Sequence, residues 1–132
     1  MSIDVVWDDE AETIIRWNFS DPWNWLEFRA AFEKSLEIGG DLPYRVDVIP
    51  YLGNSRLPVP TGALGEFNRI ARTTPKNVGL VVITGGNVLT RTIIDLFTQV
   101  YGKAGHNWHT IDSLDKARAM IAEDRAKKQG MV

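Results

Sequence analysis

The stretch Val78-Gly79-Leu80-Val81-Val82-Ile83-Thr84 decides the fold class of this chain. Its continuous run of apolar and β-branched residues is typical of a strand that is buried on both faces of a parallel sheet. Gly85-Gly86 then predicts a tight turn, and Asn87 can cap a helix by accepting a backbone N–H. Strand, turn and helix in this order form the repeating unit of an α/β protein.

Further strands and helices are predicted on both sides of this unit. Alternating or apolar runs predict the other strands at residues 3–7, 15–19, 44–49 and 108–111. Helices are predicted to start near residues 22, 61, 88 and 114. The acidic residues 8–12 are short enough to join the first two strands. The order predicts an α/β fold with a five-stranded mixed sheet and four helices, in which an opening β-hairpin precedes a βαβαβα superhelix.

Several local assignments follow from the same patterns. Asp21 is predicted as the N-cap of the first helix, and Pro50 is predicted to end the third strand. Trp7 and Trp17 lie on the opposing strands of the predicted hairpin and could form a cross-strand pair. One domain is expected over residues 1–132, with a polar tail that frays from about residue 124. Periodicity assigns the buried stripe of the third helix to Leu89, Ile93, Leu96, Phe97 and Val100.

The bulk composition excludes several classes of function. The net charge of −2 argues against a nucleic-acid binder, which normally carries a basic face. The chain has no cysteine, so it can form neither a disulfide nor a thiolate metal site. The start, Met1-Ser2-Ile3-Asp4, lacks the features of a signal peptide, and the longest apolar run, Leu80–Ile83, is too short to cross a bilayer. We therefore expect a cytoplasmic protein without an integral membrane segment.

Four local features, taken with the order of elements, resemble one known family. They are the strand Tyr44-Arg45-Val46-Asp47-Val48-Ile49, the helix start Thr61-Gly62-Ala63-Leu64, the buried strand Val78–Ile83 and the segment Ser113-Leu114-Asp115-Lys116-Ala117. This pattern resembles the anti-sigma-factor antagonists, the STAS family, and in particular its stage-II-sporulation-AA-like branch. The resemblance covers nearly the whole chain. It implies a non-enzymatic regulatory or protein-interaction module, similar to stand-alone proteins of unassigned role in that branch.

The resemblance also implies where a partner would bind. In the phosphorylated antagonists, Asp-Ser-Ser-Gly precedes the second helix and its first serine takes the phosphate, whereas this chain has Val59-Pro60-Thr61-Gly62 there. Pro60 occupies the serine position, so a serine switch at that position is not expected. The surface around Asn54, Ser55, Thr61 and Gly62, together with the start of the second helix, is then the expected contact surface for a protein partner. Thr61 or Ser55 could take a phosphate instead.

Each candidate residue also has a simpler structural interpretation. Thr61 is more often a plain N-cap than a phosphosite. Gly85, Gly86, Asn87 and Arg91 could form an anion site at a helix start, but the lysine and hydroxyl residue of a P-loop are missing, and a simple turn is favoured. Asp47 could orient a ligand near the carboxyl edge of the sheet, face solvent or pair with Arg45.

The two histidines and five tryptophans leave further alternatives open. His106 and His109 flank Trp108, but without a third histidine or a cysteine they do not predict a zinc site, and we expect neither a metal nor a cofactor. The tryptophans are expected mainly in the core, although exposed ones would mark an interface or line an apolar pocket. The alternative function is therefore a carrier or sensor of a small apolar molecule or lipid. A small hydrolase or nucleotide binder is a third possibility, and a homodimer could form through the edge of the opening hairpin.

Overall fold

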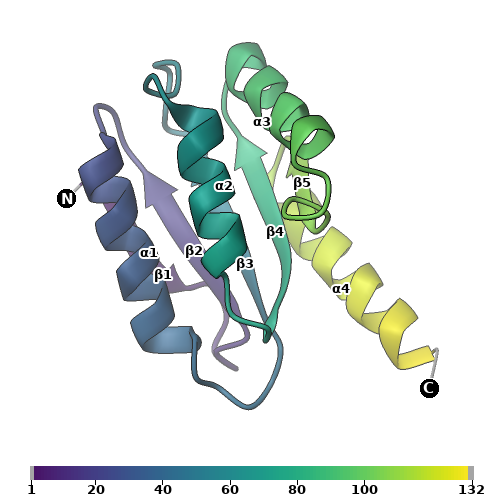
Figure 1. Cartoon of the computed structure of the whole chain (residues 1–132). Coiled ribbons are helices and arrows are strands. Elements are labelled where there is room, and N and C mark those ends of the chain that lie inside the picture. Colours follow the sequence, from purple (N-terminus) through teal and green to yellow (C-terminus); the bar gives the residue numbers. More distant parts are fainter. Residues whose placement is uncertain (1, 131–132) are drawn as a thin grey trace.

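The computed structural model describes residues 2–130, which form one five-stranded mixed sheet and four helices (Figure 1). The elements are β1 (Ile3–Trp7), β2 (Ile14–Phe19), α1 (Trp25–Gly39), β3 (Val46–Leu52), α2 (Ala63–Thr73), β4 (Val78–Gly85), α3 (Val88–Val100), β5 (Trp108–Ile111) and α4 (Leu114–Gly130). The strand order is β1-β2-β3-β4-β5, in which β1 is antiparallel to β2 and the other pairs are parallel. The predicted fold class is confirmed.

The helices cover both faces of the sheet. In Figure 1, α1, α2 and α3 lie side by side on one face, and α4 crosses the other face. The contacts of strand β4 explain its run of apolar residues. Val81 and Ile83 belong to the core beneath the three helices, whereas Leu80 and Val82 pack with Ala117 of α4. Because successive side chains of a strand point to opposite faces, a strand covered on both sides needs apolar residues at every position.

Strand β3 continues through Pro50 and ends at Leu52, so the prediction that this proline ends the strand is wrong. Pro50 itself lies opposite Trp17 of β2. The next residue, Tyr51, pairs with Asn18 of β2 and Thr84 of β4. Proline removes one N–H donor from the ladder, and the pairing of its neighbour on both sides keeps the strand in register.

Of the two helix caps predicted at Asn87 and Asp21, the first is confirmed and the second is wrong. Asn87 caps α3, since its side chain accepts a hydrogen bond from the Thr90 N–H at 2.9 Å, as predicted. Asp21 does not cap α1. Asn24 takes that place and accepts from the Glu27 N–H at 2.8 Å. Asp21 lies before the helix, and its carboxylate contacts another loop.

The predicted buried stripe of α3 is confirmed at Phe97 and in part at Ile93, which packs against the core, but it is wrong at its other positions. The buried residues of this helix are Thr90, Ile94 and Phe97, whereas Leu89 and Leu96 are exposed. Both sets recur at helical spacing, so periodicity cannot separate them. Phe97 belongs to both sets, so the burial of Thr90 and Ile94, together with the exposure of Val100, shows how α3 is rotated on the sheet.

Two further predictions are corrected, one about the opening hairpin and one about the end of the chain. Trp7 lies opposite Ile15, and Trp17 lies opposite Val5, so the two tryptophans do not form a cross-strand pair. Helix α4 continues to Gly130, where the sequence predicts a frayed tail from about residue 124; residues 131–132 of that tail lie outside the described residues. Within residues 2–130, none of the helices combines the length and the apolar composition that a bilayer crossing requires.

Candidate functional site

The residues predicted to form a contact surface lie at the carboxyl edge of the sheet. Asn54 and Ser55 follow β3, and Gly86 follows β4. These two parallel strands are in register at their ends, where Leu52 pairs with Gly85. Because parallel strands end at the same edge, the loops after them meet there, together with the starts of α1, α2 and α3. We call this edge the rim; it comprises residues 21–26, 53–62 and 85–91.

Asp21 anchors the β3–α2 loop to the segment before α1. Its carboxylate accepts a hydrogen bond from the Ser55 hydroxyl at 2.6 Å and from the backbone N–H groups of Arg56 at 2.5 Å and Leu57 at 3.1 Å. The hydrogen bond from Ser55 is the main cause that lowers the pKa of Asp21 below its ordinary value, and the two backbone N–H groups add to it. The Ser55 side chain is buried by this contact, so a kinase could reach it only after the loop opens.

Substituting Asp21 with alanine is expected to release this loop. The variant loses three hydrogen bonds to a charged acceptor, so amide hydrogen exchange at Arg56 and Leu57 should accelerate by about tenfold or more. In the unmodified protein, the anchor is present above the ordinary pKa of the carboxyl, about 3.8, and is lost as the pH falls through the lowered folded value. Exchange measured by NMR, with exposed Asp41→Ala as control, checks this; unchanged exchange in the Asp21 variant contradicts it.

The start of α2 differs from the prediction at Thr61. Gly62 is the N-cap, with a φ of +94° that favours glycine, so the assignment of Thr61 as the cap is wrong. The carbonyl of Thr61 instead accepts a hydrogen bond from the Trp25 indole N–H at 2.7 Å, which ties α2 to the start of α1. The Thr61 side chain is exposed at the N-terminus of a helix. Its role as a phosphosite stays a prediction.

The turn after β4 is tight and closely packed. Gly85 and Gly86 have φ values of +77° and +82°, and a Cβ placed on Gly85 would lie 2.9 Å from the Cα of Gly53. Only glycine allows this approach between the two loops. The Asn87 side-chain amide donates to the carbonyl of Arg56 at 3.2 Å and joins the loops further. The simpler interpretation as a turn and cap is confirmed, whereas the anion site with Arg91 stays a prediction.

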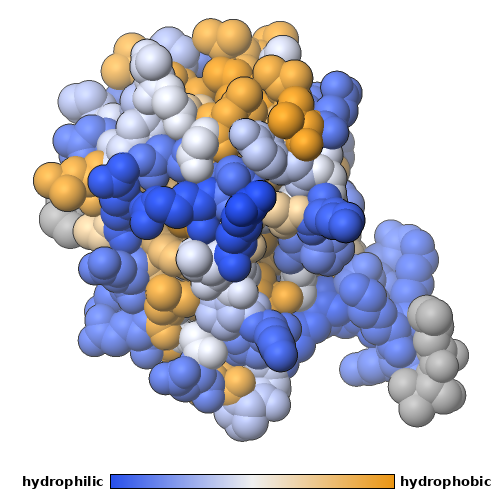
Figure 2. Space-filling model, viewed as in Figure 1, coloured by the Kyte–Doolittle hydropathy of each residue, from blue (hydrophilic) through white to orange (hydrophobic). Residues whose placement is uncertain are grey.

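Four apolar side chains are exposed along this rim. Leu26 is 75 % exposed, Leu57 53 %, Val88 81 % and Leu89 52 %. Figure 2 shows hydrophobic residues gathered over the start of α3 at the top of the molecule. Sequence reasoning missed this feature because it assigned Leu89 to the core. The available signal was position, since Leu26 and Val88 lie in the first turns of α1 and α3, one or two residues after the asparagine caps.

Asp47 lies away from the rim, near the amino end of β3, and is fully buried. Its carboxylate accepts hydrogen bonds from the Leu80 N–H at 2.6 Å, from the Arg45 guanidinium at 2.8 Å and from Arg125 Nε at 2.8 Å. The expected pairing with Arg45 is confirmed. The solvent-facing alternative is wrong, and a ligand at the carboxyl edge is out of its reach. Arg45 also binds Asp124 at 2.8 Å, so the network fixes α4 to the sheet.

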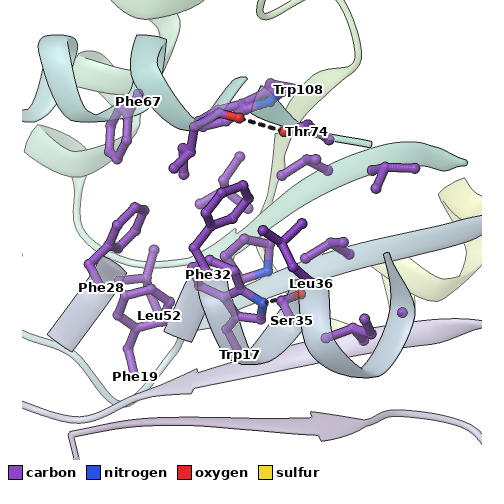
Figure 3. Close-up of a pocket in the computed structure, with 18 of the residues that line it drawn as sticks. Trp17, Phe19, Phe28, Phe32, Ser35, Leu36, Leu52, Phe67, Thr74 and Trp108 are labelled. Atoms are coloured by element: carbon purple, nitrogen blue, oxygen red, sulfur yellow. Dashed lines mark hydrogen bonds between the residues drawn. The ribbon is translucent and has the colours of Figure 1, made fainter. Parts of the chain in front are cut away.

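An apolar cavity of about 70 Å³ lies between α1, α2 and the sheet (Figure 3). On α1 it is lined by Phe28, Phe32, Leu36 and Gly39, so it follows about three turns of that helix, roughly 16 Å. Inside it, the indole N–H of Trp17 donates to the Ser35 hydroxyl at 3.2 Å. The core interpretation of the tryptophans is confirmed for the three that are buried, which are Trp17, Trp23 and Trp108.

The histidines form no metal site in the part of the chain that is described. His106 and His109 are exposed, and the Nδ1 atom of His106 lies 2.9 Å from the carbonyl oxygen of Lys103. Within residues 2–130, no three histidine, aspartate or glutamate side chains lie close enough to hold a metal ion.

Comparisons of the chain with protein-family models, with curated proteins and with solved structures found no match. What the chain does must therefore be inferred from its own residues. Two features stand out in the described residues: a rim with exposed apolar side chains on anchored loops, and an apolar cavity beneath two helices.

Proposed function

We propose that this chain is a non-enzymatic regulatory or interaction module of the STAS-like type, which binds a partner protein through the rim. The observation that carries the proposal is the exposure of Leu26, Leu57, Val88 and Leu89 at one edge of the sheet. Large apolar side chains gathered on a surface are a mark of protein-binding sites, because their contact with water is unfavourable until a partner covers them.

The contacts within the rim support this proposal, because they hold the exposed side chains in place. Leu57 is fixed by the hydrogen bond from its own N–H to Asp21. Leu26 follows Trp25, whose indole is tied to α2, and Val88 follows Asn87, which is tied to the β3–α2 loop. A surface that is already ordered loses little conformational entropy when it binds. The rim therefore suits a partner that docks without large rearrangement.

The resemblance to the anti-sigma-factor antagonists supports the same surface. Its implied contact residues Asn54, Thr61 and Gly62 are exposed at the rim, beside the apolar side chains. Phosphate on Thr61 would place about −1.5 to −2 charges at the N-terminus of α2. Such a group would change the charge of the rim at its centre, and partner binding could be regulated in this way.

Acidic substitutions at the rim are expected to abolish partner binding. In the double variant Leu57→Asp with Val88→Asp, capture of the partner from native cell extract should fall by about tenfold or more, since two desolvated apolar contacts become charged. Val100→Asp is the matched control, because Val100 is also exposed on α3 but lies at its far end. Equal recovery with all three proteins would contradict the proposal, and circular dichroism shows that each variant is folded.

A second function, a carrier or sensor of a small apolar molecule or lipid, is favoured by the cavity beneath α1 and α2. Its apolar lining extends along about three turns of α1, which suits an acyl chain. Its volume of about 70 Å³ is well below the roughly 300 Å³ of a site for drug-sized ligands, so binding would require α1 and α2 to separate. Trp17, Trp23 and Trp108 line it, so a medium-chain fatty acid that enters should shift the tryptophan fluorescence. An unchanged spectrum at saturating fatty acid removes this alternative.

A further inference from the structure

A polar hollow lies at the opposite edge of the sheet from the rim, at the amino ends of β4 and β5. Its volume is about 480 Å³, within the range of small-molecule sites. Four segments line it: the α2–β4 loop with Lys76, the start of β4, the α3–β5 loop with Lys103, and the last turns of α4 with Lys128. Separate parts of the chain thus bring their side chains together at one place.

Positive charge dominates this hollow. Lys76, Lys103 and Lys128 line it, against the single carboxylate of Asp124. That carboxylate is already engaged by Arg45 at 2.8 Å and by Lys128 at 3.2 Å. Within residues 2–130, neither Lys76 nor Lys103 forms an ion pair. The chain as a whole carries a net charge of −2, so this concentration of cations is local.

A second hollow of about 500 Å³ continues the first. The two share Lys103 and Ala104, and the second adds Arg72 from the last turn of α2. Arg72 also forms no ion pair among the described residues. Three cations that form no ion pair within residues 2–130, which are Lys76, Lys103 and Arg72, therefore lie along one connected depression.

We propose that this depression is a binding site for a small anion that carries two or more phosphate groups. Lysine is a common phosphate ligand, because its compact ammonium group can approach one oxygen directly. Several lysines on separate segments suit an anion with several separated charges. A nucleic acid is a poor fit, because the overall charge of the chain is negative and would repel the rest of a long polyanion.

The cations also have a structural alternative, which the experiment must separate from binding. Lys76 and Lys103 follow the ends of α2 and α3, and cations near helix C-termini interact favourably with the helix dipole. That role predicts a loss of stability on charge reversal but no ligand. A binding site predicts a saturable response to the anion, in addition to any effect on stability.

Titration of ¹⁵N-labelled protein with inorganic pyrophosphate at constant ionic strength tests the proposal. We expect saturable amide shifts confined to residues 71–80, 103–109 and 124–128, the segments that line the depression. In the double variant Lys76→Glu with Lys103→Glu, the Kd should rise by about tenfold or more, because two charge-assisted contacts become repulsive. Lys127→Glu is the matched control, since Lys127 lies next to Lys128 on α4, pairs with Glu123 and does not line the depression.

Each other outcome overturns the proposal. The absence of saturable shifts up to millimolar pyrophosphate, or an equal response to sodium chloride at the same ionic strength, leaves only the helix-dipole role. An equal loss of binding in Lys127→Glu indicates a nonspecific charge effect. Displacement of pyrophosphate by an oligo-glutamate peptide at lower concentration assigns the surface to an acidic protein partner. Leu57 lies at the opposite edge of the sheet, so the Leu57→Asp variant should bind pyrophosphate with an unchanged Kd. A chain that does not bind pyrophosphate would therefore leave the proposal for the rim unaffected.

Discussion

Replacing Asp47 with alanine is expected to lower the free energy of unfolding by about 3–5 kcal/mol, which would leave a domain of this size close to unfolded. Asp47 is fully buried, and its carboxylate receives hydrogen bonds from Arg45, Arg125 and the backbone N–H of Leu80. Its removal leaves two guanidinium groups without their shared partner and one buried N–H without an acceptor. Each of these losses is costly because the site is shielded from water.

Urea denaturation followed by tryptophan fluorescence measures this effect. The matched control is Asp112→Ala, which breaks an exposed ion pair with Lys116 and should leave the free energy of unfolding nearly unchanged, because water screens that pair. A second variant, Asp47→Asn, keeps an acceptor for the Leu80 N–H but removes the charge, so it should fall between the two. Equal stabilities for the Asp47 and Asp112 alanine variants would show that the network does not fix α4 to the sheet.

Replacing Phe97 with alanine is also expected to lower the free energy of unfolding by about 3–5 kcal/mol. The Phe97 ring is fully buried, and its centroid lies 4.6 Å from that of Trp108 and 5.9 Å from that of Phe67. Truncation removes the aromatic contacts and leaves a cavity that rigid neighbours in α2 and β5 cannot fill. The loss of packing therefore adds to the loss of apolar burial.

Leu96→Ala is the control that also separates two orientations of α3. Leu96 is 44 % exposed, so its truncation should change stability by no more than about 0.5 kcal/mol. The stripe predicted from the sequence places Leu96 and Phe97 together in the core. Comparable losses in the two variants, measured by thermal denaturation, would favour that orientation and contradict the structure described above.

The sequence predicts the architecture well wherever a local pattern has one interpretation. The run from Val78 to Thr84 consists of apolar and β-branched residues, so it predicts a strand covered on both faces. The cap at Asn87 is predicted equally well, because its side chain accepts a hydrogen bond from Thr90, only three residues along the chain. Strand β5 also has the predicted bounds, Trp108–Ile111. In each case the deciding contacts lie within a few residues or follow from a single period.

The errors arise where distant contacts decide between local alternatives. Asp21 has the chemistry of an N-cap, but its carboxylate binds a loop more than 30 residues away. Pro50 has the chemistry of a strand end, but pairing on both sides continues past it. Arg125 belongs to a segment with the composition of a frayed tail, and it is ordered by Asp47, 78 residues away. Composition and the period of the apolar residues do not predict which distant residues will be in contact.

The candidate site shows the same division. Resemblance to a family indicated the loop around Ser55 and Thr61 as the contact surface, and these residues do lie at the rim. Sequence reasoning did not predict the exposure of Leu26 and Val88, because burial depends on how each helix is rotated on the sheet. It also did not predict the cluster of cations at the opposite edge, because Lys76, Lys103 and Lys128 come from segments that only the fold brings together.

Site-specific photo-cross-linking tests the central claim, that the rim is the surface that meets a partner protein, most directly. A photoreactive amino acid is placed in turn at Leu57, at Val88 and at Ala122, which is exposed on α4 on the other face of the sheet. In native cells, the same protein should be cross-linked from both rim positions and not from Ala122. Cross-linking of that protein from Ala122 with equal yield, or no cross-linked protein from either rim position, would contradict the claim.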